Sequence, residues 1–151
     1  MNLKQYSTQS EKLFLADLWP EFATQEGEKN LDERAWVIVR QATMQDQTRR
    51  ADLVAEREER IHYDGSGRAN SWGQVFKENP LRRAAVEVYC TLTDCGNLTL
   101  DDNKPVFPKM PANKMTQAEF DAIWGSLPIW VAMAIHKAVL DFNPDWRTAG
   151  E

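Results

Sequence analysis

The last third of the chain carries the strongest local folding signals. Thr116 and Glu119 have the spacing of a capping box, in which each residue satisfies a free backbone N–H of the other at a helix start. The apolar spacing after them predicts a helix over 116–125. Pro128 is typical of the first turn of a helix, and the segment 128–142 is apolar on nearly all sides. The sequence therefore predicts a helical pair whose second member is buried in the centre of the fold.

A third helix is expected to complete this core. Asn79 followed by Pro80 is a strong start signal, and apolar residues then recur at helical spacing, which predicts a helix over 80–95 that ends near Gly96. We expect Trp124 to lie in the core with these helices. Asn143 and Pro144 should end the last helix, so that Trp146 folds back onto the core.

The strand signals are fewer and shorter. The segment 35–41 is the densest cluster of β-branched and aromatic residues, which favours a strand; the alternative is a long helix from Asn30, because Asn30 and Glu33 also have capping-box spacing. The segment 98–107 is typical of a small hairpin around a polar turn. We therefore predict an α+β fold, predominantly helical, with a C-terminal helical core and a small sheet made by 35–41 and the hairpin.

The remaining segments are more polar. We expect a short helix over 7–19, stopped by Pro20, and a polar connection over 21–30. The stretch 43–61 is heavily charged and predicts a solvent-facing helix, followed by a flexible loop over 64–71. The expected organisation is an N-terminal helix and linker over 1–30 and a single helical-core domain over 31–151.

Composition limits the classes of function. The formal net charge is −5, and a chain with an acidic balance is a poor candidate for non-specific nucleic-acid binding. The longest apolar run, Ile129–Ile135, is too short to cross a bilayer, and the N-terminal residues have no apolar stretch of signal-peptide length. We therefore expect a cytosolic protein with neither a membrane nor a nucleic-acid partner.

Residues with catalytic chemistry are present but do not form a recognisable set. His136 lies in the apolar helix, where a structural role is expected, and His62 suits the end of the charged helix. Asp101 and Asp102 lack the spacing of a calcium loop. Cys90 and Cys95, five positions apart, fit neither a redox motif nor a zinc site, and are expected to be reduced thiols. We predict no enzyme activity, no metal and no cofactor.

The candidate binding residues are aromatic and basic. Trp72 lies in a polar segment, where a large apolar side chain gains little unless it packs on the domain or on a partner; both possibilities stay open. Arg82 and Arg83 follow that segment and would add a charged rim or a solvated face. Arg49 and Arg57, on the charged stretch, complete the set of candidate partner-binding residues.

Two blocks of residues resemble proteins of tailed-phage morphogenesis. The first is 36–43 with the following segment 50–55, and the second runs from Arg83 through Tyr89 and the 105–107 segment to the end of the apolar helix and Trp146. Together they cover about two thirds of the chain. In these blocks the chain is similar to the small tail assembly chaperone-like proteins encoded between the major tail protein and the tape measure protein.

That resemblance implies a non-enzymatic protein of the infected host's cytoplasm that binds the tape measure protein or other tail components. It implies a role and assigns no binding residue. Two alternatives remain: a minor virion or head–tail connector protein, and an acidic regulator that binds a host factor. Oligomer formation remains open.

Overall fold

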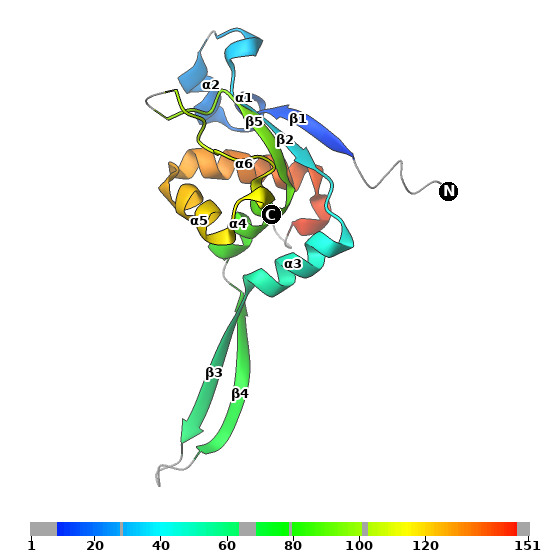
Figure 1. The fold of residues 1–151 in the computed structure, drawn as a ribbon, viewed down its shortest axis with the longest axis vertical. Coiled ribbons are helices and arrows are strands. Elements are labelled where there is room, and N and C mark those ends of the chain that lie inside the picture. The colour runs from blue at the N-terminus through cyan, green and yellow to red at the C-terminus, as the bar shows by residue number, and fades with distance from the viewer. Residues whose placement is uncertain (1–8, 28, 64–68, 79, 101–102, 148–151) are drawn as a thin grey trace, which may run out of the picture.

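The computed structural model describes residues 9–27, 29–63, 69–78, 80–100 and 103–147, and for 55–63 and 69–78 it describes the backbone. The elements are three parts of one α+β fold: a three-stranded sheet, a group of helices and a long two-stranded hairpin (Figure 1). Helices contribute more residues than strands and lie mostly in the C-terminal half, as the sequence predicted.

The sheet is antiparallel, with the order β1-β2-β5. Its strands are β1 (Ser10–Phe14), β2 (Trp36–Arg40) and β5 (Leu92–Gly96). The predicted strand at 35–41 is confirmed as β2, which lies in the centre and has Val37 and Val39 fully buried. Alternation of β-branched residues suits a central strand with one face on the core. The long helix from Asn30 is not formed.

The N-terminal prediction was wrong in its element type. Instead of one helix over 7–19, the described residues form the strand β1 and two short helices, α1 (Leu15–Leu18) and α2 (Pro20–Glu26). Pro20 begins α2 instead of stopping a helix, because a proline is well tolerated at the first helical position. Residues 10–14 become a strand because they find a long-range partner in β2.

The helical core follows the prediction closely. It consists of α4 (Pro80–Thr91), α5 (Gln117–Ser126) and α6 (Ile129–Phe142), with the short helix η3 (Ala112–Lys114) before α5. Thr116 caps α5 as predicted, since its side chain accepts a hydrogen bond from the Glu119 N–H at 3.1 Å, which is one half of the predicted capping box. Trp146 is buried, as predicted, in the short helix η4 (Pro144–Trp146).

Several predicted boundaries need correction. The helix expected to reach Gly96 ends at Thr91, because Leu92–Gly96 pairs with β2 and supplies the third strand of the sheet. The predicted hairpin within 98–107 is present as a short antiparallel pairing, with Thr99 opposite Pro105 and backbone hydrogen bonds from Leu100 to Lys104 and from Val106 to Leu98, but it lies outside that sheet. Trp124, expected in the core, is half-buried and packs against it, where it stacks on the fully buried Phe120.

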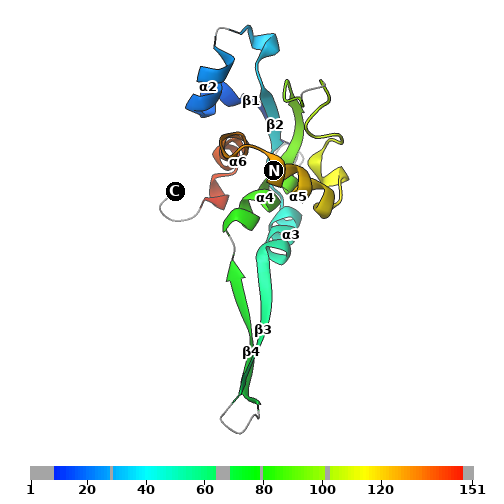
Figure 2. The same ribbon diagram turned by 90° about the vertical axis from the view of Figure 1, so that its left-hand side faces the viewer.

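The largest correction concerns the charged stretch. The helix α3 (Met44–Val54) ends seven residues before the predicted end at Ile61, and β3 (Ala55–Tyr63) follows it. This strand pairs antiparallel with β4 (Ala69–Glu78), so part of the expected loop is strand as well. In both views the hairpin extends away from the body of the molecule (Figures 1 and 2).

Candidate partner-binding site

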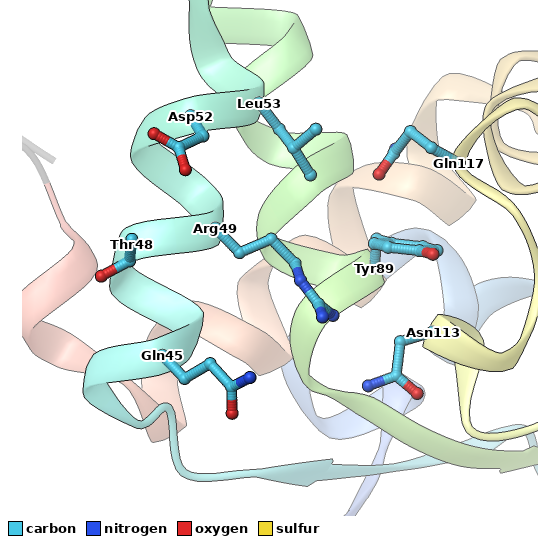
Figure 3. Close-up of a pocket in the computed structure, with 8 residues that line it drawn as sticks. All are labelled: Gln45, Thr48, Arg49, Asp52, Leu53, Tyr89, Asn113 and Gln117. Atoms are coloured by element: carbon cyan, nitrogen blue, oxygen red, sulfur yellow. The ribbon is translucent and has the colours of Figure 1, made fainter.

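A polar cleft lies where α3 faces α4, η3 and the start of α5 (Figure 3). Its volume is about 630 Å³, within the range of ligand-binding clefts. The residues that line it are Gln45, Thr48, Arg49, Asp52 and Leu53 from α3, Tyr89 from α4, Asn113 from η3 and Gln117 from α5. This cleft, called the α3 cleft below, contains one of the five predicted binding residues, Arg49.

The position of Arg49 follows from the helical repeat. On α3, Gln45, Arg49 and Asp52 are spaced by four and three positions and therefore share one face, which lines the cleft. Figure 3 shows the Arg49 side chain extending from α3 toward Tyr89 and Asn113. Arg49 is half-buried, and it makes no hydrogen bond or ion pair with any residue in the described part of the chain.

The neighbouring arginine is held in place. Arg50 points to another face of α3, where its Nε donates a hydrogen bond to Oε2 of Glu87 at 3.1 Å. Its guanidinium also lies over the ring of Trp146, 5.4 Å from the centroid. The indole N–H of Trp146 donates to Gln47 at 2.6 Å. These contacts fix α3 on the body and leave the cleft face of the helix exposed beside them.

The far wall of the α3 cleft also carries polar groups. Tyr89 is buried, and its hydroxyl is used, because it donates to the Met115 carbonyl at 2.7 Å. Gln117 is half-buried; its amide nitrogen donates to Asp121 at 2.9 Å, whereas its carbonyl oxygen is buried without a hydrogen-bond partner among the described residues. An unpaired buried acceptor is unfavourable in an isolated chain, so Gln117 can gain from a bound N–H donor.

A second hollow lies between α4 and α6 and is mostly apolar. This α4–α6 groove has a volume of about 400 Å³. Its apolar lining consists of Trp19, Leu81, Ala84, Met133 and Leu140. Leu81 is 81% exposed and Met133 is 44% exposed. Two large apolar side chains that line the same groove are usually more buried than this. The groove can therefore bury apolar side chains of another molecule.

Basic residues border the apolar groove. Arg83, Lys137 and Arg147 are among the residues that line it, together with His136. Lys137 and Arg147 both bind the carboxylate of Asp141, the lysine at 3.1 Å, so that part of the rim is neutralised within the chain. Arg83 therefore lies at the border of the α4–α6 groove.

Arg82 has a different position from its neighbour. Its guanidinium forms an ion pair with Asp121 of α5, and its Nε lies 3.5 Å from the carbonyl oxygen of Leu53 near the end of α3. Arg82 therefore connects α3, α4 and α5 at the point where the hairpin leaves the body. This arrangement supports a structural contribution, at the border of the α3 cleft, because Leu53 lines that cleft and Asp121 accepts a hydrogen bond from Gln117, which lines it as well.

The other two predicted residues lie on the hairpin. Arg57 occupies a position on β3 opposite Phe76, and Trp72 occupies a position on β4 opposite Ile61. The backbone of Trp72 thus lies toward the end of the hairpin that is farthest from the helical core (Figure 1). The five candidates are distributed over the cleft, the groove, the hairpin root and the hairpin, and do not form one site.

Sequence reasoning missed a buried ionic cluster. Glu87 is fully buried on α4, where its carboxylate binds Arg50 and also lies 2.9 Å from Nε2 of His136. The expected structural role of His136 agrees with this contact. The signal available in the sequence was a single acid inside an otherwise apolar helical stripe, which calls for a basic partner.

A second ion pair joins the sheet to α3. Arg40 contacts both carboxylate oxygens of Asp46, at 2.5 and 2.8 Å, and Asp46 also accepts from the Thr43 backbone N–H at 2.8 Å. Burial alone would raise the pKa of Asp46, but the hydrogen bonds from Arg40 and Thr43 outweigh it and hold that pKa below its ordinary value. Asp46 is therefore a helix-capping carboxylate that is ionised in the folded chain.

The two cysteines are free, as expected. Burial raises the pKa of Cys90 to about 11, and burial with the nearby Asp94 raises the pKa of Cys95 to about 11. Thiols with such pKa values are poor nucleophiles and poor metal ligands at neutral pH. No group of three or more potential metal-ligating side chains occurs among the described residues, which do not include Asp101 and Asp102.

Comparisons with known proteins identify no relative. No family model, no curated protein and no solved structure matches the chain. Among the helices that the structure describes, none combines the length and the apolar character needed to span a bilayer.

Proposed function

We propose that the chain is a non-enzymatic assembly protein of a tailed phage, specifically a tail assembly chaperone that binds the tape measure protein or another tail component. The proposal joins the resemblance in the sequence with the surfaces of the fold. The observation that carries it is the β3–β4 hairpin, which extends from the body next to the apolar α4–α6 groove.

The hairpin supports a partner-binding role for a physical reason. A two-stranded hairpin is marginally stable in water by itself, and each strand presents a row of backbone N–H and C=O groups along its outer edge. The ladder pairs Ala55 with Glu78 at the root and Tyr63 with Ala69 at the far end. Within the described chain no third strand joins either edge. A partner that adds a strand would satisfy those groups.

The groove supports the same role from the side of the body. Leu81 lies in the first turn of α4, directly after the hairpin returns to the body. The exposed apolar residues of the groove therefore lie next to the end of the hairpin that joins the body. A chaperone for an elongated partner needs such a surface, because it must cover apolar side chains of that partner reversibly.

Co-expression with the tape measure protein of the same phage tests the proposal. The expected result is that the tape measure protein becomes soluble and co-purifies with this chain. Mass spectrometry of purified virions should then find the chain absent, because a chaperone leaves the finished tail. Its presence in stoichiometric amounts would instead favour the alternative of a minor virion or head–tail connector protein.

A matched pair of variants shows whether the groove takes part. Leu81→Asp introduces a charge in the groove, and Ile129→Asp introduces the same charge at a residue that is 82% exposed and does not line the groove. Both changes should leave the melting temperature nearly unchanged, since both side chains are exposed. Co-purification should be lost with Leu81→Asp only; equal retention by both variants would exclude the groove.

A further inference from the structure

We propose that the α3 cleft binds a carboxylate side chain within an extended acidic segment of the partner, with Arg49 as the residue that recognises it. That the segment belongs to a tail component rests on the proposed function; the chemistry of the site rests on the cleft alone. The cleft is separate from the apolar groove, because the two share no lining residue.

Arg49 differs from other arginines of the chain in its ion pairing. Arg40, Arg50, Arg82 and Arg147 each bind a carboxylate of this chain. Arg49, half-buried in the cleft, binds none within the described residues. A guanidinium partly removed from water gains most from a carboxylate, which it can bind through two parallel hydrogen bonds. The missing partner of Arg49 is therefore expected to come from another molecule.

The balance of charge selects the kind of anion. The lining contains one cation, Arg49, and one anion, Asp52, and its other polar residues are uncharged amides and hydroxyls. A phosphate group or a nucleic-acid backbone requires several cations to offset its charge. A single carboxylate requires one. Arg49 and Asp52 form no ion pair with each other among the described residues, so the guanidinium is available for one carboxylate, whereas Asp52 and the lack of further cations disfavour a phosphate.

The remaining groups point to a peptide rather than a small acid. The buried carbonyl oxygen of Gln117 lacks a donor, and the Asn113 and Gln45 amides offer both donors and acceptors. An extended peptide supplies alternating N–H and C=O groups at about 3.3 Å per residue. Leu53 and the Tyr89 ring add apolar surface between the polar groups. A backbone segment with one acidic side chain uses all of these features.

Nuclear magnetic resonance of the full-length labelled chain tests the inference with defined probes. The probes are an acetylated and amidated Gly-Gly-Glu-Gly-Gly peptide, the matched peptide with Gln in place of Glu, sodium acetate and inorganic phosphate. The Glu peptide should shift the Arg49 Nε–H and Gln117 side-chain resonances, with an apparent Kd at least about tenfold lower than that of the Gln peptide.

Three variants separate recognition from general charge. Arg49→Gln should abolish the shifts, and Arg49→Lys should restore only part of the affinity, because an ammonium group lacks the planar fork. Lys114→Gln removes one positive charge from exposed η3, next to the cleft but outside its lining, and should bind the Glu peptide like the unchanged chain.

Four results would overturn the inference: no shift at Arg49 up to the solubility limit of the Glu peptide, equal affinity for the Gln peptide, acetate binding as tightly as the Glu peptide, or phosphate binding more tightly than either. These outcomes do not depend on any tail protein. A cleft that binds the Glu peptide in a chain that fails to co-purify with the tape measure protein would refute the proposed function and leave the site intact.

Discussion

The helical body and the β3–β4 hairpin are held together by different interactions. In the body, fully buried side chains from α4, α5 and α6 form one core with those of β2, and ion pairs join the elements around it. In the hairpin, two strands of 9 and 10 residues are joined by backbone ladder pairs and extend away from that core (Figure 2).

This difference separates two kinds of residues in the sequence. Residues of the body are constrained by packing, so that a change is expected to affect folding before it affects any partner. Residues of the hairpin are paired with each other by their backbones, and in the proposed function they are constrained by the partner. We therefore expect that the stability of the body and the binding of a partner can be changed independently by mutation.

The largest effect is expected at Phe120. This side chain is fully buried and lies between Tyr89, Phe107 and Trp124, with ring centroids 5.3, 6.0 and 5.8 Å away. Phe120→Ala removes those contacts and leaves a cavity, which should lower the free energy of unfolding by about 3–5 kcal/mol. Urea denaturation followed by circular dichroism measures the change.

Trp124→Ala is the matched comparison for that measurement. Its ring is half-buried, so its removal should cost roughly half as much as removal of Phe120. A cost for Trp124→Ala equal to or above that of Phe120→Ala would contradict the ranking of these two side chains by burial.

The ionic cluster should give the next effect. Glu87→Ala leaves the partly buried Arg50 and His136 without their shared carboxylate, and breaking a buried pair in this way costs about 3–5 kcal/mol at most. Because Arg50 and His136 each keep 15% of their side-chain surface exposed, water can replace part of the lost contact, so we expect about 3 kcal/mol. The double variant Glu87→Ala with Arg50→Ala should lose less than the sum of its single changes.

Much of the body was predictable because its signals are local. The capping box at Thr116, the start of α4 at Pro80 and the β-branched strand at 36–40 each depend on residues close together in the sequence. The strands that were missed depend on distant partners. Ser10–Phe14 and Leu92–Gly96 become strands because β2 lies between them, and no pattern within either segment states that.

The hairpin was missed because one feature supports two structures. Glu56 and Arg60 are spaced for a helical ion pair, which favoured a helix to residue 61. The same stretch pairs with β4, where aromatic and β-branched residues such as Val75 and Phe76 lie opposite it. Two runs of similar length around the Gly-rich segment 64–68 were the available signal for a hairpin.

The sequence predicted one residue of the candidate site, Arg49, and did not predict the cleft around it. Arg49 was selected as a basic residue on a charged helix, and the cleft around it is made by four elements that meet only in the folded chain. The same limit explains why Glu87 was not selected, since its two partners lie 37 and 49 residues away. Polar contacts between residues that are far apart in the sequence cannot be predicted from local patterns.

The acid stability of the body should depend on Asp46. Its pKa is lowered in the folded chain, so the unfolded chain takes up a proton first as the pH falls. The stabilisation is therefore complete above the unfolded value of about 3.9 and is lost as the pH falls through the lower, folded value. Urea midpoints between about pH 6 and about pH 2 should fall less steeply for Asp46→Asn than for the unchanged chain. Parallel curves for the two proteins would contradict this assignment.

The smallest effect on stability is expected from removing the hairpin itself. Replacing residues 56–77 with a short Gly-Ser linker keeps α3, α4 and the contacts of Arg82 that join them to α5, and it removes two strands that form a sheet separate from β1-β2-β5. The free energy of unfolding should change by no more than about 1 kcal/mol, because the entropy cost of closing a loop changes only slowly with its length. Co-purification with the tape measure protein should nevertheless be lost, although the body remains folded. If the shortened chain fails to fold, the hairpin belongs to the cooperative unit of the body, and the separation between stability and binding argued above is wrong. If it folds and binds as before, partner binding depends on the body alone, and the α4–α6 groove with the α3 cleft would have to account for all of it.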